Sequence, residues 1–328
     1  MGKTYLSHLF ALWSLIGLGL WGSCSPDAKP PMIEHALSAT LLNPIPFAPM
    51  ELGEGALWHP LRQELWWVDI EGKKLYGFQP ASQTTWQKTL PSRIGTVVPQ
   101  GEDQAIVALE DGVYRLGLST DKLEKIAEVE AEAPRLRLND GKCDPLGNLW
   151  VGSLQMEDIQ PVAALYRVNE AGEVKKMLGE VQISNGICWS LDGQTLYYID
   201  TPLRNVRAFD FAAGEISGEK VVIEFPEGTG YPDGMTMDEA GNLWIAMWAG
   251  KSVQCWDPRT GKKLAHLAVD ALNVTSVAFG GSQLDTLYIT TASIGMTEAE
   301  KAQYPKAGKL FYALPGVKGM EAAFFGAK

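Results

Sequence analysis

One short pattern recurs six times along this chain: an apolar pair that begins a strand and is followed by small or polar residues. Its copies are spaced 40, 44, 47, 47 and 44 residues apart and read LWWVD at 65, AIVAL at 105, LWVGS at 149, LYYID at 196, LWIAM at 243 and LYITT at 287. A second strand with an aromatic residue follows most copies, and helical periodicity is hard to find outside the N-terminal segment, which excludes a helical solenoid. Repeats of about 45 residues, each with room for four short strands, are typical of a β-propeller. The sequence therefore predicts an all-β, six-bladed β-propeller, and we expect the segment before the first copy to help close the ring.

The first 24 residues have the pattern of an export signal. One lysine is followed by an apolar stretch and then by small residues directly before Cys24. This order resembles a bacterial lipoprotein signal, in which Cys24 is lipidated and becomes the new N-terminus, although Trp21 stands where leucine is usual. A plain signal peptide and an uncleaved anchor are the alternatives. We expect a flexible tether over 25–35, a propeller over 36–328, and an exported periplasmic or cell-envelope lipoprotein that touches the membrane only through Cys24.

Charge and cysteine usage exclude several other functions. The formal net charge is −11 and no cluster of Lys or Arg occurs, so the basic surface that nucleic-acid binding needs is missing. The cysteines after Cys24 are 45 and 67 residues apart, with no C-x-x-C pair: Cys143, Cys188 and Cys255. We expect buried free thiols rather than a metal site.

Nucleophilic catalysis of the Ser-His-Asp kind is not indicated. The chain has no G-x-S-x-G motif, and the histidines outside the signal, His35, His59 and His266, do not lie at metal-ligand spacing. We expect His59, at a turn, and His266, in an outer strand, to be structural or to face solvent.

Oxygen-bearing residues recur at one phase of the repeat. We take the repeated strand as the innermost strand of its blade, so that residues about ten positions before each copy meet near the axis. Those pairs are Glu54-Gly55, Ile94-Gly95, Asp140-Gly141 (after Asn139), Asn185-Gly186, Asp233-Gly234 and Thr275-Ser276. Asn-Gly and Asp-Gly are favoured turn dipeptides, and we read these segments as turns leading into the inner strands. Carboxylate and amide oxygens suit a hard cation, so Glu54, Asn185 and Asp233 predict a divalent-cation site with positions left for water and substrate.

Four segments in order resemble the senescence-marker-protein/gluconolactonase family, which includes regucalcin and bacterial sugar lactonases. They are LGEGALWHP with LWWVDI, RLRLNDGKCDPLGNLWVGSL, ISNGICWSLDGQTLYYID, and GYPDGMTMDEAGNLWIAMW with WDPRTGKKL, which together cover nearly everything from Glu51 to Ala292. The resemblance implies a six-bladed propeller and an enzyme, a carboxylic-ester hydrolase that converts a sugar (aldono-) lactone to the aldonic acid.

The same resemblance implies roles for individual residues. Glu54, Asn185 and Asp233 match the ligands of one divalent metal ion, for which Ca²⁺ or Zn²⁺ is expected and Mn²⁺ or Mg²⁺ is also compatible. The ion would polarise the lactone carbonyl, and Asp233 would be the catalytic base that assists water attack.

The substrate-binding residues implied by the resemblance come from blade three. Arg137 and Asn139 match residues that hold the hydroxyls of the lactone, and Asp140 lies beside them. Glu157 falls where some members place a further contact, although QMED departs from the usual small residues there. Arg135 and Lys142 are expected to be bystanders.

Three other readings stay open. The propeller could be a non-catalytic interaction platform, a hydrolase of a non-sugar lactone or ester related to luciferin-regenerating enzymes, or a calcium-binding protein without turnover. The repeat signatures of many interaction propellers, in which G-H and W-D recur from blade to blade, are absent. No obligate protein partner is expected.

Overall fold

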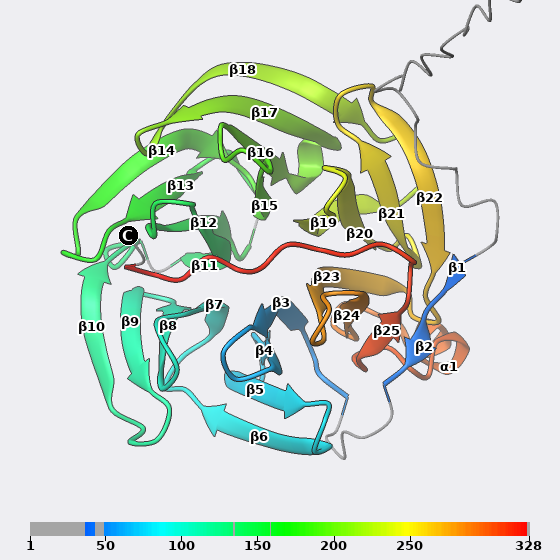
Figure 1. Ribbon diagram of the computed structural model, residues 1–328, viewed down its shortest axis with the longest axis horizontal. Coiled ribbons are helices and arrows are strands. Elements are labelled where there is room, and N and C mark those ends of the chain that lie inside the picture. The colour runs from blue at the N-terminus through cyan, green and yellow to red at the C-terminus, as the bar shows by residue number, and fades with distance from the viewer. Residues whose placement is uncertain (1–36, 43–48, 134, 158, 327–328) are drawn as a thin grey trace, which may run out of the picture. The chain divides into compact units, whose positions relative to one another are not determined.

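The computed structural model describes residues 37–42, 49–133, 135–157 and 159–326, whose strands form six sheets arranged around one axis (Figure 1). Each sheet contains four antiparallel strands, and one carries a fifth, parallel strand at its edge. The predicted all-β, six-bladed propeller is therefore confirmed. The predicted signal, the lipidation site Cys24 and the whole of the tether over 25–35 lie outside the described residues.

Each blade is built from consecutive strands, from the axis outward. The six innermost strands are buried over most of their length: β3 (Gly53–His59), β7 (Ile94–Pro99), β11 (Leu136–Cys143), β15 (Ser184–Trp189), β19 (Tyr231–Met237) and β23 (Asn273–Gly280). The second strands carry the recurring apolar pattern: β4 (Glu64–Asp69), β8 (Gln104–Leu109), β12 (Leu149–Gln155), β16 (Thr195–Asp200), β20 (Leu243–Trp248) and β24 (Thr286–Ala292). Our assignment of the repeated strand to the innermost position was wrong by one strand.

The outer half of each blade is more exposed. The third strands are β5 (Lys74–Gln79), β9 (Gly112–Gly117), β13 (Ala163–Val168), β17 (Asn205–Ala212), β21 (Ser252–Asp257) and β25 (Phe311–Ala313). The fourth strands of blades one to five are β6 (Thr84–Thr89), β10 (Leu123–Glu128), β14 (Val174–Val181), β18 (Glu215–Glu224) and β22 (Lys262–Ala268). His266 lies in β22, the outer strand in which we expected it.

The N-terminal segment completes the ring, as expected. Strand β2 (Thr40–Leu41) pairs antiparallel with β25 and supplies the fourth strand of blade six. Strand β1 (Leu37–Ser38) pairs parallel with β22 of blade five. Because these strands come from the opposite end of the chain, they tie the last two blades to the beginning of the sequence and protect their edges.

Helical structure is minor in the part of the chain that the structure describes. It consists of η1 (Thr201–Leu203), which follows β16, and α1 (Glu298–Gln303), which precedes β25. None of the helices in these described segments is long and apolar enough to cross a membrane. The three described cysteines are free and buried, as predicted.

Two turns explain why the sequence DxxGNLW recurs. In blade three, the buried Asp144 carboxylate accepts hydrogen bonds from the backbone of Leu146 and Asn148, from the Asn148 side chain and from the Trp150 indole, at 2.8–2.9 Å. Asp238 makes the equivalent four contacts in blade five, at 2.9–3.1 Å. One carboxylate thus fixes the turn and positions the buried tryptophan of the second strand.

Every inner strand has an irregularity at the same place. The pairing register with the second strand shifts at Glu54/Leu57, Ile94/Thr96, Leu138/Gly141, Asn185/Ile187, Pro232/Met235 and Val274/Val277. Such bulges redirect side chains, and here they occur beside the residues that we had placed in turns. RLRLNDG is therefore largely part of inner strand β11, and our reading of it as a turn leading into that strand was wrong.

The glycines of these bulges are explained by close backbone approach. A Cβ at Gly95 would lie 2.5 Å from the Leu138 carbonyl oxygen, and one at Gly186 would lie 2.7 Å from the Asp233 carbonyl oxygen. Of the five glycines at this phase only Gly55 has a positive φ, 59°. The neighbouring inner strands therefore require glycine because their backbones nearly touch at the axis.

Candidate active site

The bulges bring the predicted metal ligands together in the interior. Glu54 on β3, Asn185 on β15 and Asp233 on β19 come from blades one, four and five, and their exposed fractions are 7%, 5% and 4%. Coulombic repulsion from Glu54 acts on Asp233, which shows that the two carboxylates are neighbours although they are far apart in sequence. The structure thus brings residues of three separate repeats into one cluster.

The positive charge of Arg137 only partly offsets the burial and mutual repulsion of the carboxylates in this cluster. Burial, followed by the charge of Asp140, raises the pKa of Glu54 to about 8. Burial raises the pKa of Asp233 well above its usual range, and repulsion from Glu54 and Asp140 adds to the effect. Asp233 Oδ1 is buried without a hydrogen-bond partner among the described residues. Since ionised carboxylates are costly to bury unpaired, this arrangement favours a bound cation.

A continuous chain of hydrogen bonds links blades three, four and five. Arg137 donates to Asn139 Oδ1 at 2.6 Å, and Asn139 Nδ2 donates to Asn185 Oδ1 at 2.7 Å. Asn185 Nδ2 donates to the Thr201 hydroxyl at 2.8 Å, and that hydroxyl donates to the Pro232 carbonyl at 2.8 Å. A guanidinium at one end can only donate and a carbonyl at the other can only accept, so the chain fixes the orientation of both amides. Asn185 Oδ1 keeps a second lone pair for a cation.

The predicted substrate residues lie at different depths. Arg137 and Asn139 are 7% and 5% exposed, and burial lowers the pKa of Arg137 to about 10. Asp140 is half-buried, and its carboxylate accepts a hydrogen bond from Gly141 N at 2.8 Å. Arg137, Asn139 and Asp140 therefore adjoin the cation ligands. Glu157 is exposed beyond the end of β12, and within the described residues no hydrogen bond or ion pair joins it to this cluster.

The two residues set aside as bystanders differ. Arg135 is exposed, as expected of a surface residue. Lys142 belongs to inner strand β11, and its ammonium donates to the Met235 carbonyl of β19 at 2.9 Å, which places it inside the ring. The turn position that we assigned to Lys142 was therefore wrong, because the residue belongs to the inner strand, whereas its expected lack of a role in the reaction stays a prediction.

Sequence reasoning also missed a charged cluster that acts on Arg137. Arg93 pairs with Glu71 and with Glu110, both at 2.8 Å, and the charges of all three residues influence Arg137. Glu71 lies two residues after β4, Glu110 directly follows β8, and Arg93 directly precedes inner strand β7. No sequence motif marked these three residues. Their shared position near strand ends beside the cluster is the signal that could have identified them.

The composition of the ligand set limits which ions fit. No group of three or more His, Cys, Asp and Glu side chains in the described segments could hold a metal ion. The predicted set contains two carboxylates and one amide oxygen, so it does not form such a group, yet it is a donor set that hard cations such as Ca²⁺ accept. The unpartnered Asp233 oxygen is consistent with such an ion.

Fold and cluster together define a class of protein: a six-bladed β-propeller that gathers oxygen donors from several blades at its axis. Residues 52–293 match the model of the SMP-30/Gluconolactonase/LRE-like region. The chain belongs to this family, which confirms the resemblance seen in the sequence.

Individual relatives agree with this assignment. The chain is 40% identical over 264 residues to the "Putative sugar lactone lactonase YvrE" of Bacillus subtilis, which covers 80% of this chain and 90% of that protein. It is 35% identical to regucalcin of Danio rerio, over 82% and 93% of the two chains. Among solved structures, the calcium-binding protein regucalcin of Agrobacterium tumefaciens superposes with a TM-score of 0.84 at 28% identity, over 89% of this chain and 98% of that one. A luciferin-regenerating enzyme superposes with a TM-score of 0.81 at 30% identity, over 87% and 98%.

Proposed function

We propose that this protein hydrolyses a sugar lactone to the corresponding aldonic acid, with one divalent cation held by Glu54, Asn185 and Asp233. The observation that carries the proposal is the buried, unpartnered Asp233 oxygen in a cluster of repelling carboxylates. The family and the named lactonase relative support the reaction class, a carboxylic-ester hydrolase. The calcium-binding relative supports the cation, for which Ca²⁺ or Zn²⁺ is proposed and Mn²⁺ or Mg²⁺ is compatible.

The bound cation would supply Lewis-acid polarisation of the lactone carbonyl and stabilise negative charge as water adds. Asp233 accepts the proton of the attacking water on the carboxylate oxygen that does not bind the cation. The charge of the bound cation, together with that of Arg137, would keep Asp233 ionised against burial and the repulsion of Glu54 and Asp140. After ring opening, the protonated Asp233 can return its proton to the departing alkoxide.

Substrate orientation falls to Arg137 and Asn139. Arg137 uses one terminal nitrogen on Asn139 Oδ1 and on the Leu138 carbonyl, which leaves its other N–H groups for substrate oxygens. Asp140 can accept from a hydroxyl with the oxygen that Gly141 does not occupy. A neutral ligand rich in hydroxyls matches this mixture of donors and acceptors. For Glu157, the resemblance remains the only support for a substrate contact.

The test is an aldono-lactone hydrolysis assay on the chain lacking residues 1–24, with and without a chelator. We expect activity to disappear in excess chelator and to return with a divalent salt. Asp233→Asn keeps the shape of the side chain but removes the base, and should lower kcat by two or more orders of magnitude, in line with the ~10²–10⁴-fold contribution of general bases. Glu239→Gln, an exposed change beside blade five, is the matched control and should retain activity.

The outcomes separate the competing functions. Undiminished hydrolysis in excess chelator, or in Asp233→Asn, would refute the mechanism. A chain that binds the cation but turns over only non-sugar lactones or esters would keep the cation site and reassign Arg137 and Asn139. Cation binding without turnover of any lactone or ester would favour a calcium-binding role.

We also propose that the N-terminal segment directs export and lipidation at Cys24. The apolar stretch and the small residues before Cys24 support this assignment. Expression of the full chain and of Cys24→Ser in a bacterium, followed by membrane fractionation, tests it. Membrane association of the wild type should be lost in Cys24→Ser, and equal fractionation of the two would contradict lipidation.

A further inference from the structure

A cavity of about 340 Å³ lies at the far ends of the inner strands, away from the bulges. Its walls come from the final residues of β3, β11, β15, β19 and β23, whereas Glu54, Asn185 and Asp233 lie nearer the beginnings of their strands. Its volume is within the range of roughly 300–1,000 Å³ that is typical of small-molecule sites. The cavity therefore opens at the other end of the ring from the candidate active site.

The two sites are separated by packed inner strands. Between them lies a small space of about 10 Å³, lined by residues that include Asp140, Lys142 and Met235. This is about the space that one water molecule needs. A sugar lactone cannot pass through it, so the cavity is not an extension of the active site.

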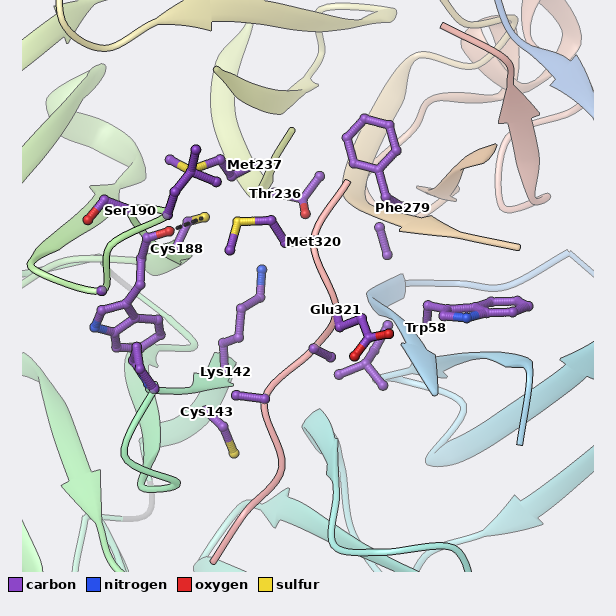
Figure 2. A pocket seen from close by; sticks show the side chains of 18 of the residues that line it. Trp58, Lys142, Cys143, Cys188, Ser190, Thr236, Met237, Phe279, Met320 and Glu321 are labelled. Carbon is purple, nitrogen blue, oxygen red and sulfur yellow. Dashed lines mark hydrogen bonds between the residues drawn. The ribbon is translucent and has the colours of Figure 1, made fainter. Parts of the chain in front are cut away.

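Lys142 brings an unusual charge into this cavity. Its half-buried side chain extends from β11 toward the centre of the cavity (Figure 2), and the ammonium makes one hydrogen bond, to the Met235 carbonyl at 2.9 Å. No carboxylate of the described residues lies within the 4.0 Å of an ion pair, although Asp140 and Lys142 interact at longer range. An ammonium has three donors, so two remain for a ligand.

The rest of the lining is mainly apolar. The walls include Leu57, Trp189, Met237, Val277 and Phe279. The carboxylates among the lining residues, Asp192 and Glu321, are both exposed and so lie at the rim. An anionic group at Lys142 with an apolar body along the walls would match this distribution of charge.

The segment that covers the cavity is tied to the propeller by backbone hydrogen bonds near its two ends. We call residues 318–326 the C-terminal strap; it runs across the ring as the red segment after β25 in Figure 1. Gly319 N donates to Leu284 O at one end, and Phe325 N donates to Pro99 O at the other, both at 2.8 Å. Between these ends, residues 320–324 make no backbone–backbone hydrogen bond to the part of the chain that the structure describes. Side chains hold the middle of the strap instead: Ala322 and Ala323 pack against the hydrophobic core, and the Phe324 ring lies edge-on to His59 with centroids 5.5 Å apart. The strap thus forms a packed wall of the cavity.

We propose that this cavity is a second ligand site, which binds a small apolar carboxylate through Lys142, beneath the C-terminal strap. The carboxylate of the ligand pairs with the ammonium of Lys142, and its hydrocarbon body contacts Met237, Phe279 and Met320. The site is independent of the proposed lactone hydrolysis, because it uses none of the residues assigned to that reaction.

Calorimetric titration of the full chain with octanoate tests the proposal. One octanoate should bind per chain, and 1-octanol, which has the same body without the charge, should bind at least ten-fold more weakly. Lys142→Met should weaken octanoate binding at least ten-fold, and Lys142→Arg should stay within a few-fold of the wild type. Asp233→Asn is the control for the other site and should bind octanoate like the wild type.

A second variant protects the test against misfolding of Lys142→Met. Ala322→Phe fills the cavity from the strap and leaves Lys142 intact, so it should also abolish binding of octanoate. The proposal is overturned if wild type shows no saturable octanoate binding, if octanol binds equally well, or if folded Lys142→Met or Ala322→Phe binds like the wild type. Loss of octanoate binding in Asp233→Asn would also overturn it, by placing the ligand in the active site.

Discussion

The Thr201 hydroxyl offers the sharpest test of how the cation site is held. Thr201 is 9% exposed, accepts a hydrogen bond from Asn185 Nδ2 and donates one to the Pro232 carbonyl, both at 2.8 Å. Thr201→Val keeps the branched shape and removes both hydrogen bonds. Asn185 then keeps only the hydrogen bond from Asn139 to its oxygen and loses the one that anchors its Nδ2, so the amide is held less firmly in the orientation that the proposed cation site needs. Groups that orient metal ligands typically contribute ~10–100-fold in metal affinity or activity, and we expect a loss of cation affinity in that range.

The size of the stability change follows from the same contacts. Leaving the Asn185 amide and the Pro232 carbonyl without partners costs about 1–3 kcal/mol for each buried group. For a domain of this size, each kcal/mol corresponds to roughly 2–4 °C in Tm. Thr201→Ser retains the hydroxyl and loses only a methyl group, so it serves as the matched control and should keep most of the cation affinity.

The assay is a competition titration between the protein and a chelating dye, followed by kcat/KM at saturating cation. Thr201→Val should show the weakened cation affinity, and high cation concentration should restore most of its activity, because Asp233 and Arg137 remain. Cation affinities of Thr201→Val and Thr201→Ser that both equal the wild-type value would refute the reasoning. The hydrogen-bond chain would then be a packing feature without influence on the ligand.

Three further predictions concern the fold. Leu42→Pro removes the N–H that donates to Leu310 O at 2.9 Å where the N-terminal segment closes blade six, and should lower the free energy of unfolding in urea by about 1–2 kcal/mol relative to Leu42→Ala. Asp238→Ala removes four hydrogen bonds inside blade five and should cost about 3 kcal/mol or more in the same measurement, whereas a change below 1 kcal/mol would contradict its role in the turn. Burial lowers the pKa of His59, so unfolding binds a proton and stability is lost as the pH falls from about 6.5 through the lowered value. Melting temperatures of wild type and His59→Gln, measured at about pH 7.5 and about pH 5, should differ less between the two pH values in the variant. An equal difference in both proteins would show that His59 does not contribute to the pH dependence of stability.

The sequence predicted the number of blades but not the radial position of the repeated strand. A period of about 45 residues fixes how often a blade recurs, and it is the same whichever strand is used as the marker. The apolar pair is most conspicuous in the second strand, which packs between two neighbours, whereas the inner strand carries polar residues such as Asn139 and Asp233. The apolar pattern therefore led us to take the second strand of each blade as the innermost one.

Counting back from each repeated strand identified the candidate cation ligands, but it missed the residues that orient their side chains. Glu54, Asn185 and Asp233 share a phase because each occupies the same bulge, so the error in strand assignment did not affect them. Thr201 comes after a second strand, so a count of the residues that precede each repeated strand does not reach it. Lys142 was misplaced for another reason: Asn-Asp-Gly-Lys is a typical turn sequence, and only the structure shows that its glycine is packed closely against the Trp150 carbonyl of β12 and the Thr96 side chain of β7.

The hydrogen-bond chain also changes the role that Asn139 can have. Its Nδ2 donates both to Ser184 O and to Asn185 Oδ1, at 2.7 Å, and its Oδ1 accepts from Arg137. Both N–H groups of the amide are thus used within the protein, and only one lone pair on Oδ1 stays free. Asn139 can therefore accept a hydrogen bond from a substrate hydroxyl, but it cannot donate one without releasing Ser184 O or Asn185 Oδ1. A substrate that hydrogen-bonds to Arg137 shifts the Arg137–Asn139 contact, and Asn139 in turn contacts the oxygen of Asn185. We therefore infer that the Asn139 amide couples substrate binding to the proposed cation ligand Asn185.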